Sequence, residues 1–149
     1  MPYEFKHVRR VQFRETDAAG IVYFANFFGW MEEAEHAFFR ALGFSVHEGT
    51  PGALGWPRVS VRCDYKAPLR FEDEAEIHLL VKEKRSKSLT YTFIIRKIEG
   101  ESWPEVARGE ITAVCVAWDE ITGQMKAVTM PEALAAQIEV APQELLDKP

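Results

Sequence analysis

Residues 14–43, RETDAAGIVYFANFFGWMEEAEHAFFRALG, decide the fold, because they join a polar loop to one long apolar helix. Over residues 24–42, apolar side chains recur at intervals of three and four, which places them on one face of a helix. Gly43 follows as a residue suited to the left-handed turn that ends many helices. The apolar positions are Phe24, Phe27, Phe28, Met31, Ala34, Phe38 and Leu42.

The apolar sector of this helix is wider than a surface helix needs, so we expect a sheet to cover most of it. Trp30, Ala37, Phe39 and Ala41 provide the extra width. Gly29 costs about 1 kcal/mol relative to alanine inside a helix, which predicts close packing at that position. The polar side is predicted to carry Glu32, Glu35, His36 and Arg40.

The rest of the chain predicts antiparallel strands. Residues 5–13 suggest a first strand, and residues 58–66 alternate between apolar and polar side chains as a half-buried strand does. Residues 75–82 and 89–95 alternate in the same way around a charged turn, which predicts a hairpin. Residues 106–118 are rich in strand formers and predict one last long strand.

The connections are predicted from glycine and proline. Residues 44–57 hold three Gly and two Pro, which indicates an extended loop. Pro131 is expected to open a short helix that runs to about Ala136 or Ile138. Residues 139–149 are predicted to be a polar, poorly ordered tail. The expected fold is α+β in one domain, residues 1–149, with a five-stranded antiparallel sheet wrapped around one long helix and a short C-terminal helix.

Composition narrows the functional classes. With 149 residues, 47% hydrophobic residues and a net charge of −5, the chain resembles an ordinary soluble domain and not a general nucleic-acid binder. No 18-residue apolar run or basic-then-apolar leader is present, so we expect a cytoplasmic protein without a membrane span. Cys63 and Cys115 are predicted to be buried thiols. The four histidines lack metal-ligand spacing, which predicts no metal site.

The loop before the helix is the candidate site. Asp17 brings a carboxylate close to the first helical amides, which lack internal partners and attract negative charge. A carboxylate and a group that polarises an electrophile could therefore meet here. From the residues alone, the more common role of an Asp before a helix is favoured, which is to close an Asx-turn or cap the helix.

The segment TDAAGIVYFANFFGWMEEA resembles the signature of the 4-hydroxybenzoyl-CoA thioesterase family of hotdog-fold acyl-CoA hydrolases. The resemblance continues through GWPRVSVRCDYKAPLRFED, VKEKRSKSL and MPEAL. It implies a hotdog fold and hydrolysis of an acyl-CoA thioester, such as the aromatic 4-hydroxybenzoyl-CoA, to a free acid and coenzyme A. No metal or organic cofactor is implied, because coenzyme A is part of the substrate. It also implies a homodimer, often paired into a homotetramer, with active sites between subunits.

The resemblance implies roles for three residues of the loop. Asp17 would act either as the nucleophile or as the base that activates water, and the sequence does not separate these. The backbone amide of Phe24 would bind the oxyanion, and Gly20 would shape the approach. Glu32 and Glu33 are rival carboxylates, which we expect to form solvated pairs such as Glu32 with His36.

A second group of residues is implied to bind the substrate. Arg85 and Lys87 match positions that hold the phosphates of coenzyme A, Ser86 stands where some relatives carry Arg, and Lys84 could share this role. The same residues could instead form an ordinary solvated turn. Trp56 could flank the acyl or thiol end, or simply pack on the helix.

Two other functions remain open from the sequence. A non-catalytic hotdog protein that binds acyl-CoA or acyl carrier protein would keep the basic cluster without needing Asp17. A hotdog hydratase or dehydratase would pair a carboxylate with a nearby His, and no His lies close to Asp17 in the sequence.

Overall fold

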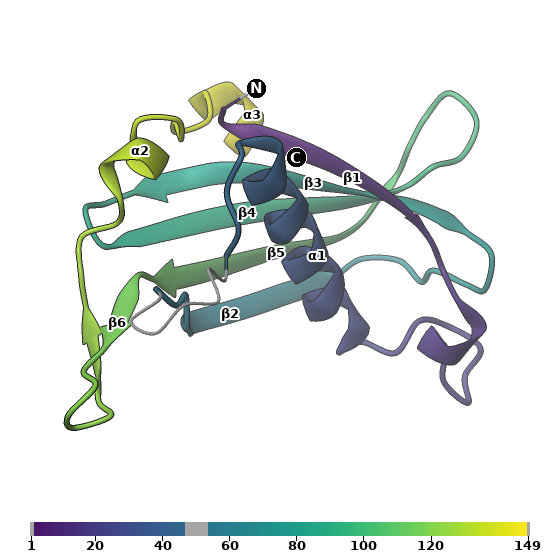
Figure 1. Cartoon of the computed structure of the whole chain (residues 1–149). Helices are drawn as coiled ribbons and strands as arrows, with labels where there is room; N and C mark the ends of the chain where they lie inside the picture. Colours follow the sequence, from purple (N-terminus) through teal and green to yellow (C-terminus); the bar gives the residue numbers. More distant parts are fainter. Residues whose placement is uncertain (1, 47–53, 149) are drawn as a thin grey trace.

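The structure, a computed structural model, describes residues 2–46 and 54–148. A long helix, α1 (Asn26–Ala41), lies across one face of a five-stranded antiparallel sheet (Figure 1). This arrangement confirms the predicted helix and sheet. The strand order is β1-β3-β4-β5-β2, with β1 Glu4–Arg10, β2 Arg58–Tyr65, β3 Glu74–Lys84, β4 Ser88–Lys97 and β5 Glu105–Val114.

The sheet has two distinct ends. At the helix-start end, Arg10 pairs with Glu74, and the chain leaves β1 for the loop that precedes α1. At the hairpin end, residues 85–87 connect β3 to β4, which confirms the predicted hairpin. Strand β2 runs from the hairpin end to the helix-start end, because Arg58 pairs with Ala113 and Tyr65 with Ala107.

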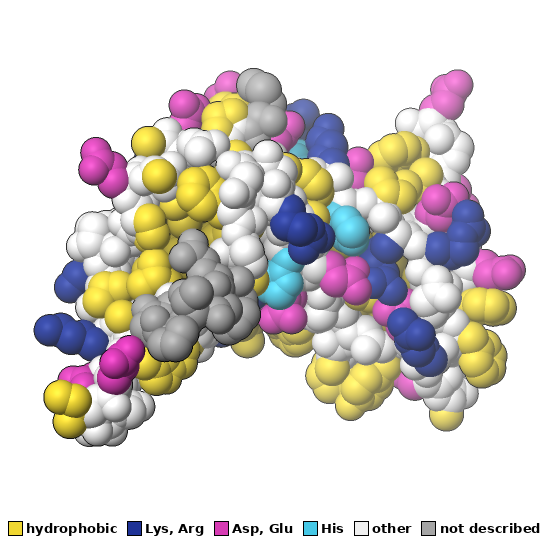
Figure 2. Space-filling view, in the orientation of Figure 1, with side chains coloured by type: hydrophobic (Ala, Val, Ile, Leu, Met, Phe, Trp, Pro, Cys, Tyr) yellow, Lys and Arg dark blue, Asp and Glu magenta, His cyan; other side chains and the backbone are white. Residues whose placement is uncertain are grey.

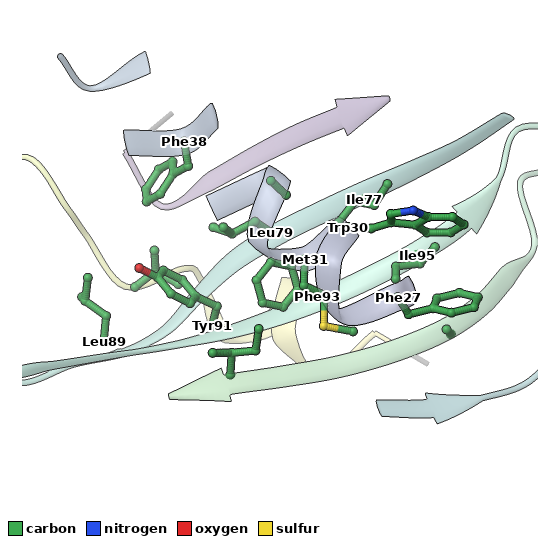
Figure 3. Packing of buried hydrophobic residues seen from close by; sticks show 14 of the residues in the cluster. Phe27, Trp30, Met31, Phe38, Ile77, Leu79, Leu89, Tyr91, Phe93 and Ile95 are labelled. Atoms are coloured by element: carbon green, nitrogen blue, oxygen red, sulfur yellow. The ribbon is translucent and has the colours of Figure 1, made fainter. Parts of the chain in front are cut away.

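The core lies between α1 and the sheet. Phe27, Trp30, Met31 and Phe38 of the helix point into a layer of strand side chains that includes Tyr91 (Figure 3). Hydrophobic packing of this kind is the main stabilising term in a small domain. The strand side chains labelled in this layer are Ile77, Leu79, Leu89, Tyr91, Phe93 and Ile95.

Close packing of helix and sheet occurs at Gly109 and not at Gly29. A Cβ at Gly109 would lie 2.1 Å from the Met31 Cε, so only glycine fits at this position without a shift. A Cβ at Gly29 would meet no atom within 4 Å. The close contact predicted at Gly29 is therefore wrong, because that side of α1 faces open space.

The predicted polar side of α1 is wrong for Glu35. Its side chain is buried and forms a two-pronged ion pair with Arg58 of β2, at 2.5 and 3.0 Å. Glu32 also lies 3.6 Å from Arg58, and His36 lies 3.9 Å from Glu35, so the predicted pair of Glu32 with His36 is replaced by these contacts. Glu35 can be buried because the charge of Arg58, on a strand distant in sequence, compensates its own.

The expected last strand is split. Beyond β5 the chain forms a separate hairpin of β6 (Val116–Trp118) and β7 (Met125–Ala127), which the sequence did not predict. The first strand is also shorter than predicted, because it ends at Arg10 and a 3-10 turn, η1 (Phe13–Glu15), follows. Within the predicted loop 44–57, residues 47–53 lie outside the described part of the chain, and Gly55 pairs with Val116.

The C-terminal region is more ordered than predicted. Helix α2 (Glu132–Ala135) follows Pro131 and confirms the expected short helix. The tail, however, forms α3 (Gln143–Leu146) and packs on the outer face of the sheet, where Ala141 is buried against Leu80 and Ile94. Its apolar residues explain why the prediction of a poorly ordered tail is wrong.

Two further sequence expectations concern the cysteines and membrane-spanning helices. Cys63 and Cys115 form no disulfide; Cys115 is buried, whereas Cys63 is only half-buried because β2 is an edge strand. No helix within residues 2–46 and 54–148 is long and apolar enough to cross a membrane.

Candidate active site

The loop before α1 folds back on itself. Thr16 pairs with Val22 in an antiparallel bridge, and the Asp17 amide donates to the Ile21 carbonyl at 3.0 Å. The Gly20 amide donates to the Asp17 carbonyl at 2.9 Å, with a φ of +78° that favours glycine. Asp17 therefore lies opposite Ile21 near the tip of this turn, and the chain runs from Val22 through Tyr23 and Phe24 into α1.

Asp17 is exposed in the single protomer. One carboxylate oxygen, Oδ1, accepts a hydrogen bond from the Ala19 amide at 2.8 Å, which is the Asx-turn anticipated as the local alternative. The other oxygen accepts no hydrogen bond from the described residues, so it is available to a ligand.

The start of α1 offers unpaired donors. Within the described chain, the Phe24 and Ala25 amides donate to no backbone carbonyl. The helix has neither a capping side chain nor an acidic residue in its first turn, so nothing there offsets its partial positive charge. The Tyr65 hydroxyl donates to the Phe24 carbonyl at 2.8 Å and thereby holds this residue in place. Burial raises the pKa of Tyr65 to about 12, so the hydroxyl keeps its proton.

Glu15 anchors the loop, a role that sequence reasoning missed. Its carboxylate accepts hydrogen bonds from Arg9 at 2.5 Å, the Trp30 indole at 2.7 Å and the Gln12 amide at 2.8 Å. Burial alone would raise the pKa of Glu15, but these donors and the Arg9 charge lower it below its usual value. The Glu15 carbonyl also accepts from the Asn26 side chain at 2.8 Å. The three-residue spacing from Gln12 to Glu15, that of a capping box, was the available signal.

The predicted phosphate-binding residues form an exposed turn at the hairpin end. Arg85 is ion-paired with Glu83, while Ser86 and Lys87 have exposed side chains. Lys84 differs from the prediction, because its ammonium group donates to the carbonyls of Ala135 at 2.9 Å and Ile138 at 2.8 Å. Lys84 therefore holds the segment around α2 against the sheet.

Trp56 also lies toward the hairpin end. Its ring packs edge-on against Phe39 at 5.7 Å, as expected of a side chain that covers the helix. It also borders a hollow of about 220 Å³ lined by Glu35, His36 and Arg58. The nearby Tyr91 hydroxyl is buried with no hydrogen-bond partner among the described residues, and its pKa is raised well above the usual value by burial and by the Glu35 charge.

The two groups of predicted site residues are far apart in one protomer. The Asp17 loop leaves the sheet at Arg10, opposite the first residue of β3, whereas the 85–87 turn follows the last residue of β3. Since β3 has 11 residues, the two ends are separated by about 33 Å. The structure places Asp17 and Gly20 in one turn, with Phe24 four residues after Gly20 at the entrance to α1, but does not bring Arg85, Lys87 or Trp56 to them within one protomer.

The fold and this loop are those of a thioesterase-like protein. The profile of the Thioesterase-like superfamily matches residues 11–138, and the chain therefore belongs to this superfamily. This membership confirms the family suggested by the sequence.

Relatives with assigned names match different shares of the chain. Acyl-CoA thioester hydrolase YbgC of Escherichia coli O6:H1 is 29% identical over 133 residues, which cover 89% of this chain and 94% of that protein. The 4-hydroxybenzoyl-CoA thioesterase of Pseudomonas sp. strain CBS-3 is 31% identical over 83 residues, 54% of this chain and 59% of that protein.

Solved structures confirm the hotdog fold. The 1,4-dihydroxy-2-naphthoyl-CoA thioesterase Slr0204 from Synechocystis superposes with a TM-score of 0.78 at 23% identity, over 91% of this chain and 95% of that one. A mutant of 4-hydroxybenzoyl-CoA thioesterase in complex with 4-hydroxybenzoyl-CoA also gives 0.78, at 21% identity, over 92% and 99% of the two chains.

Proposed function

We propose that this protein is an acyl-CoA thioesterase that hydrolyses a thioester to a free acid and coenzyme A. The observation that supports the proposal is an exposed Asp17 carboxylate with one free oxygen, in the turn that leads to the unpaired Phe24 and Ala25 amides before α1, in a chain of the thioesterase superfamily. The carboxylate supplies the attacking or activating oxygen, and the amides supply donors for the developing negative charge.

The proposed chemistry uses only groups of this chain. The Phe24 amide donates to the thioester oxygen as it becomes an oxyanion. Asp17 either attacks the carbonyl carbon, giving a mixed anhydride that water then cleaves, or removes a proton from the attacking water. In both routes the C–S bond breaks and the thiol of coenzyme A leaves with a proton. Label in the Asp17 carboxylate after a single turnover in ¹⁸O-labelled water would establish the anhydride route, because only water that attacks the Asp17 carbonyl of an anhydride can place it there.

We propose that the functional unit is a homodimer joined along β2. This strand lies at the edge of the sheet, and its apolar residues Val59, Val61 and Tyr65 remain 63%, 50% and 44% exposed. An edge strand with unpaired backbone N–H and C=O groups and apolar side chains tends to associate with another strand. Strand β2 of a second copy can form hydrogen bonds with these groups and closes the assembly as a dimer. Two such dimers could pair into a tetramer, which sedimentation would distinguish from a dimer.

A dimer of this kind would complete the site. A strand that pairs edge to edge with its own copy about a two-fold axis runs antiparallel to that copy. The hairpin end of one protomer would then lie beside the helix-start end of the other. Arg85 and Lys87 would reach the phosphates of a coenzyme A whose thioester lies at the other protomer's Asp17, and Trp56 would approach the acyl group from the same side.

The substrate class follows from the relatives. The named relatives include hydrolases of 4-hydroxybenzoyl-CoA and 1,4-dihydroxy-2-naphthoyl-CoA, so we propose an aromatic acyl-CoA as the first substrate to test. We also propose a cytoplasmic location, which suits two unpaired thiols. Hydrolysis as written needs no metal or organic cofactor.

The test is thiol release from a panel of aromatic and fatty acyl-CoAs by the wild type and by Asp17→Asn. We expect the substitution to lower kcat about a hundredfold or more, because it removes the attacking or proton-accepting oxygen while keeping a similar shape. Asp147→Asn, at an exposed position near the C-terminus, is the matched control and should retain full activity. Equal hydrolysis by wild type and Asp17→Asn across the panel would refute the proposal; binding of acyl-CoA without hydrolysis would favour a non-catalytic binder.

A further inference from the structure

Two segments project past the β2 edge, at its opposite ends (Figure 1). One is the β6–β7 arm, residues 116–127, at the hairpin end. Its apolar side chains are unusually exposed, with Trp118 at 45%, Ile121 at 95% and Met125 at 55%. Exposed large apolar side chains that gather on one projection indicate a contact surface.

The second projection, at the helix-start end, is also apolar at its surface. Phe13 and Phe71 are 74% and 49% exposed, and their rings pack edge to face at 5.6 Å. Tyr23, next to the start of α1, is 46% exposed. We call Phe13, Tyr23 and Phe71, together with the exposed cations Arg14 and Arg70, the Phe13 surface.

The tip of the arm and the two arginines of the Phe13 surface carry opposite charges. The tip of the arm carries Asp119 and Glu120, both exposed, whereas the Phe13 surface carries Arg14 and Arg70. Hydrogen bonds from the Thr122 and Ile121 amides lower the pKa of Asp119, so its carboxylate is ionised at neutral pH. Figure 2 shows acidic and hydrophobic side chains together at the tip of the lower left projection, which is the arm in Figure 1.

Backbone hydrogen bonds and the packing of Trp118 fix the orientation of the arm relative to the sheet. Gly55 and Val116 exchange two backbone hydrogen bonds at its base, both at 2.9 Å, and the Asp119 amide donates to the Gln124 carbonyl at 2.9 Å near its tip. The Trp118 ring lies over Gly55 so closely that a Cβ there would be 2.5 Å from it. This contact fixes Trp118 beside the start of β2.

We propose that the β6–β7 arm of each protomer packs on the Phe13 surface of a second copy of this chain and forms one wall of that copy's Asp17 site. The inference rests on the proposed edge-to-edge dimer, whose two-fold axis places the hairpin end of one protomer beside the helix-start end of the other. Apolar residues then meet apolar residues, and Asp119 and Glu120 meet Arg14 and Arg70. Because the dimer is symmetric, the contact occurs twice.

Disulfide trapping tests the contact. The full-length chain carries Ile121→Cys and Phe71→Cys in a Cys63→Ser, Cys115→Ala background. These two cysteines lie at opposite ends of one protomer, so a disulfide between them can form only between protomers. We expect mild oxidation of the dimer to give a covalent dimer on a denaturing gel. The matched control pairs Ile121→Cys with Val8→Cys, which is 51% exposed on the far edge strand and should give none.

Charge reversal provides an independent measurement. Glu120→Arg and Arg14→Glu should each raise the dimer dissociation constant about two- to fivefold, as expected for an exposed ion pair, and the double variant should restore much of the loss. Glu144→Arg, exposed on α3, is the control for a change of net charge. Absence of any effect of the single reversals would overturn the inference.

The outcomes separate this inference from the proposed function. A trapped dimer that hydrolyses no acyl-CoA supports the arm contact and counts against the thioesterase. If the protein is dimeric and hydrolyses acyl-CoA, but the Ile121–Phe71 pair cross-links no better than the Val8 control, only the arm contact is overturned. The apolar arm would then bind a different partner. A monomeric protein overturns the inference.

Discussion

At the scale of single residues, two glycines on facing elements have different roles. Gly109 on β5 lies under Met31, where a side chain would collide with the methionine sulfur and methyl group. Gly29 on α1 faces open space, so nothing in the fold requires its small size. The first glycine permits close contact of helix and sheet, while the second only weakens the helix.

Alanine at these two positions should therefore have opposite effects. We expect Gly29→Ala to raise the free energy of unfolding by about 0.5–1 kcal/mol, because alanine has the higher helix propensity. Gly109→Ala should lower it by about 1–3 kcal/mol, because the core would be overpacked. Urea unfolding of both variants and the wild type measures the two changes, and a stabilising Gly109→Ala would contradict the close packing described here.

At the scale of elements, Glu15 ties its own loop to two elements, β1 and α1. Its carboxylate binds Arg9 of β1 and Trp30 of α1, and its carbonyl binds Asn26 at the first turn of α1. The position of the Asp17 loop therefore depends on a buried carboxylate two residues away. A hydrogen bond to a charged buried group contributes about 1.5–3 kcal/mol, more than a neutral one.

The pH dependence of stability should report this anchor. The folded pKa of Glu15 is lower than its usual value of 4.5. Its contribution is therefore complete above that usual value and is lost as the pH falls through the folded pKa, when the carboxylate takes up a proton. We expect the midpoint of thermal unfolding of the wild type to fall more steeply below pH 4.5 than that of Glu15→Gln. Glu144→Gln on the exposed face of α3 is the control, and identical acid profiles for Glu15→Gln and the wild type would contradict this role.

At the scale of the whole molecule, the shape of one protomer leaves the site open. Asp17 and the basic turn of Arg85 and Lys87 lie at opposite ends of the sheet, and the apolar side of β2 is exposed between them. In an antiparallel dimer along β2, the basic turn of each protomer would lie beside Asp17 of the other, so the dimer would hold two such sites. A substitution that prevents dimer formation should therefore also abolish thioesterase activity.

A charge placed on the β2 edge tests this dependence. Val61→Lys puts an ammonium group at the proposed interface, where it would be buried without a partner, so we expect monomers that lack thioesterase activity but remain folded. Val8→Lys is a close match, because Val8 is 51% exposed on β1 and Val61 is 50% exposed on β2. Sedimentation and thiol release should show the control to be dimeric and active. A fully active Val61→Lys monomer would contradict a site shared between protomers.

Local patterns in the sequence predicted most of the architecture. The three-and-four spacing of apolar residues located α1, and strict alternation located β2, β3 and β4. The segment from Thr16 to Ala34 identified the family and selected Asp17, Gly20 and Phe24. Each of these signals depends only on a short stretch of sequence, so it can be recognised without knowing how the rest of the chain folds.

Only the tertiary structure decided which distant residues meet. Glu35 is buried because Arg58 lies opposite it, and Lys84 is held by the carbonyls near α2; neither contact has a local signature. The tail orders because its apolar side chains reach the sheet, and the β6–β7 arm projects because β5 ends early. Periodicity in a sequence reports which face of an element is apolar, whereas the pairing of charges and the distance between site residues depend on how the elements are arranged in space.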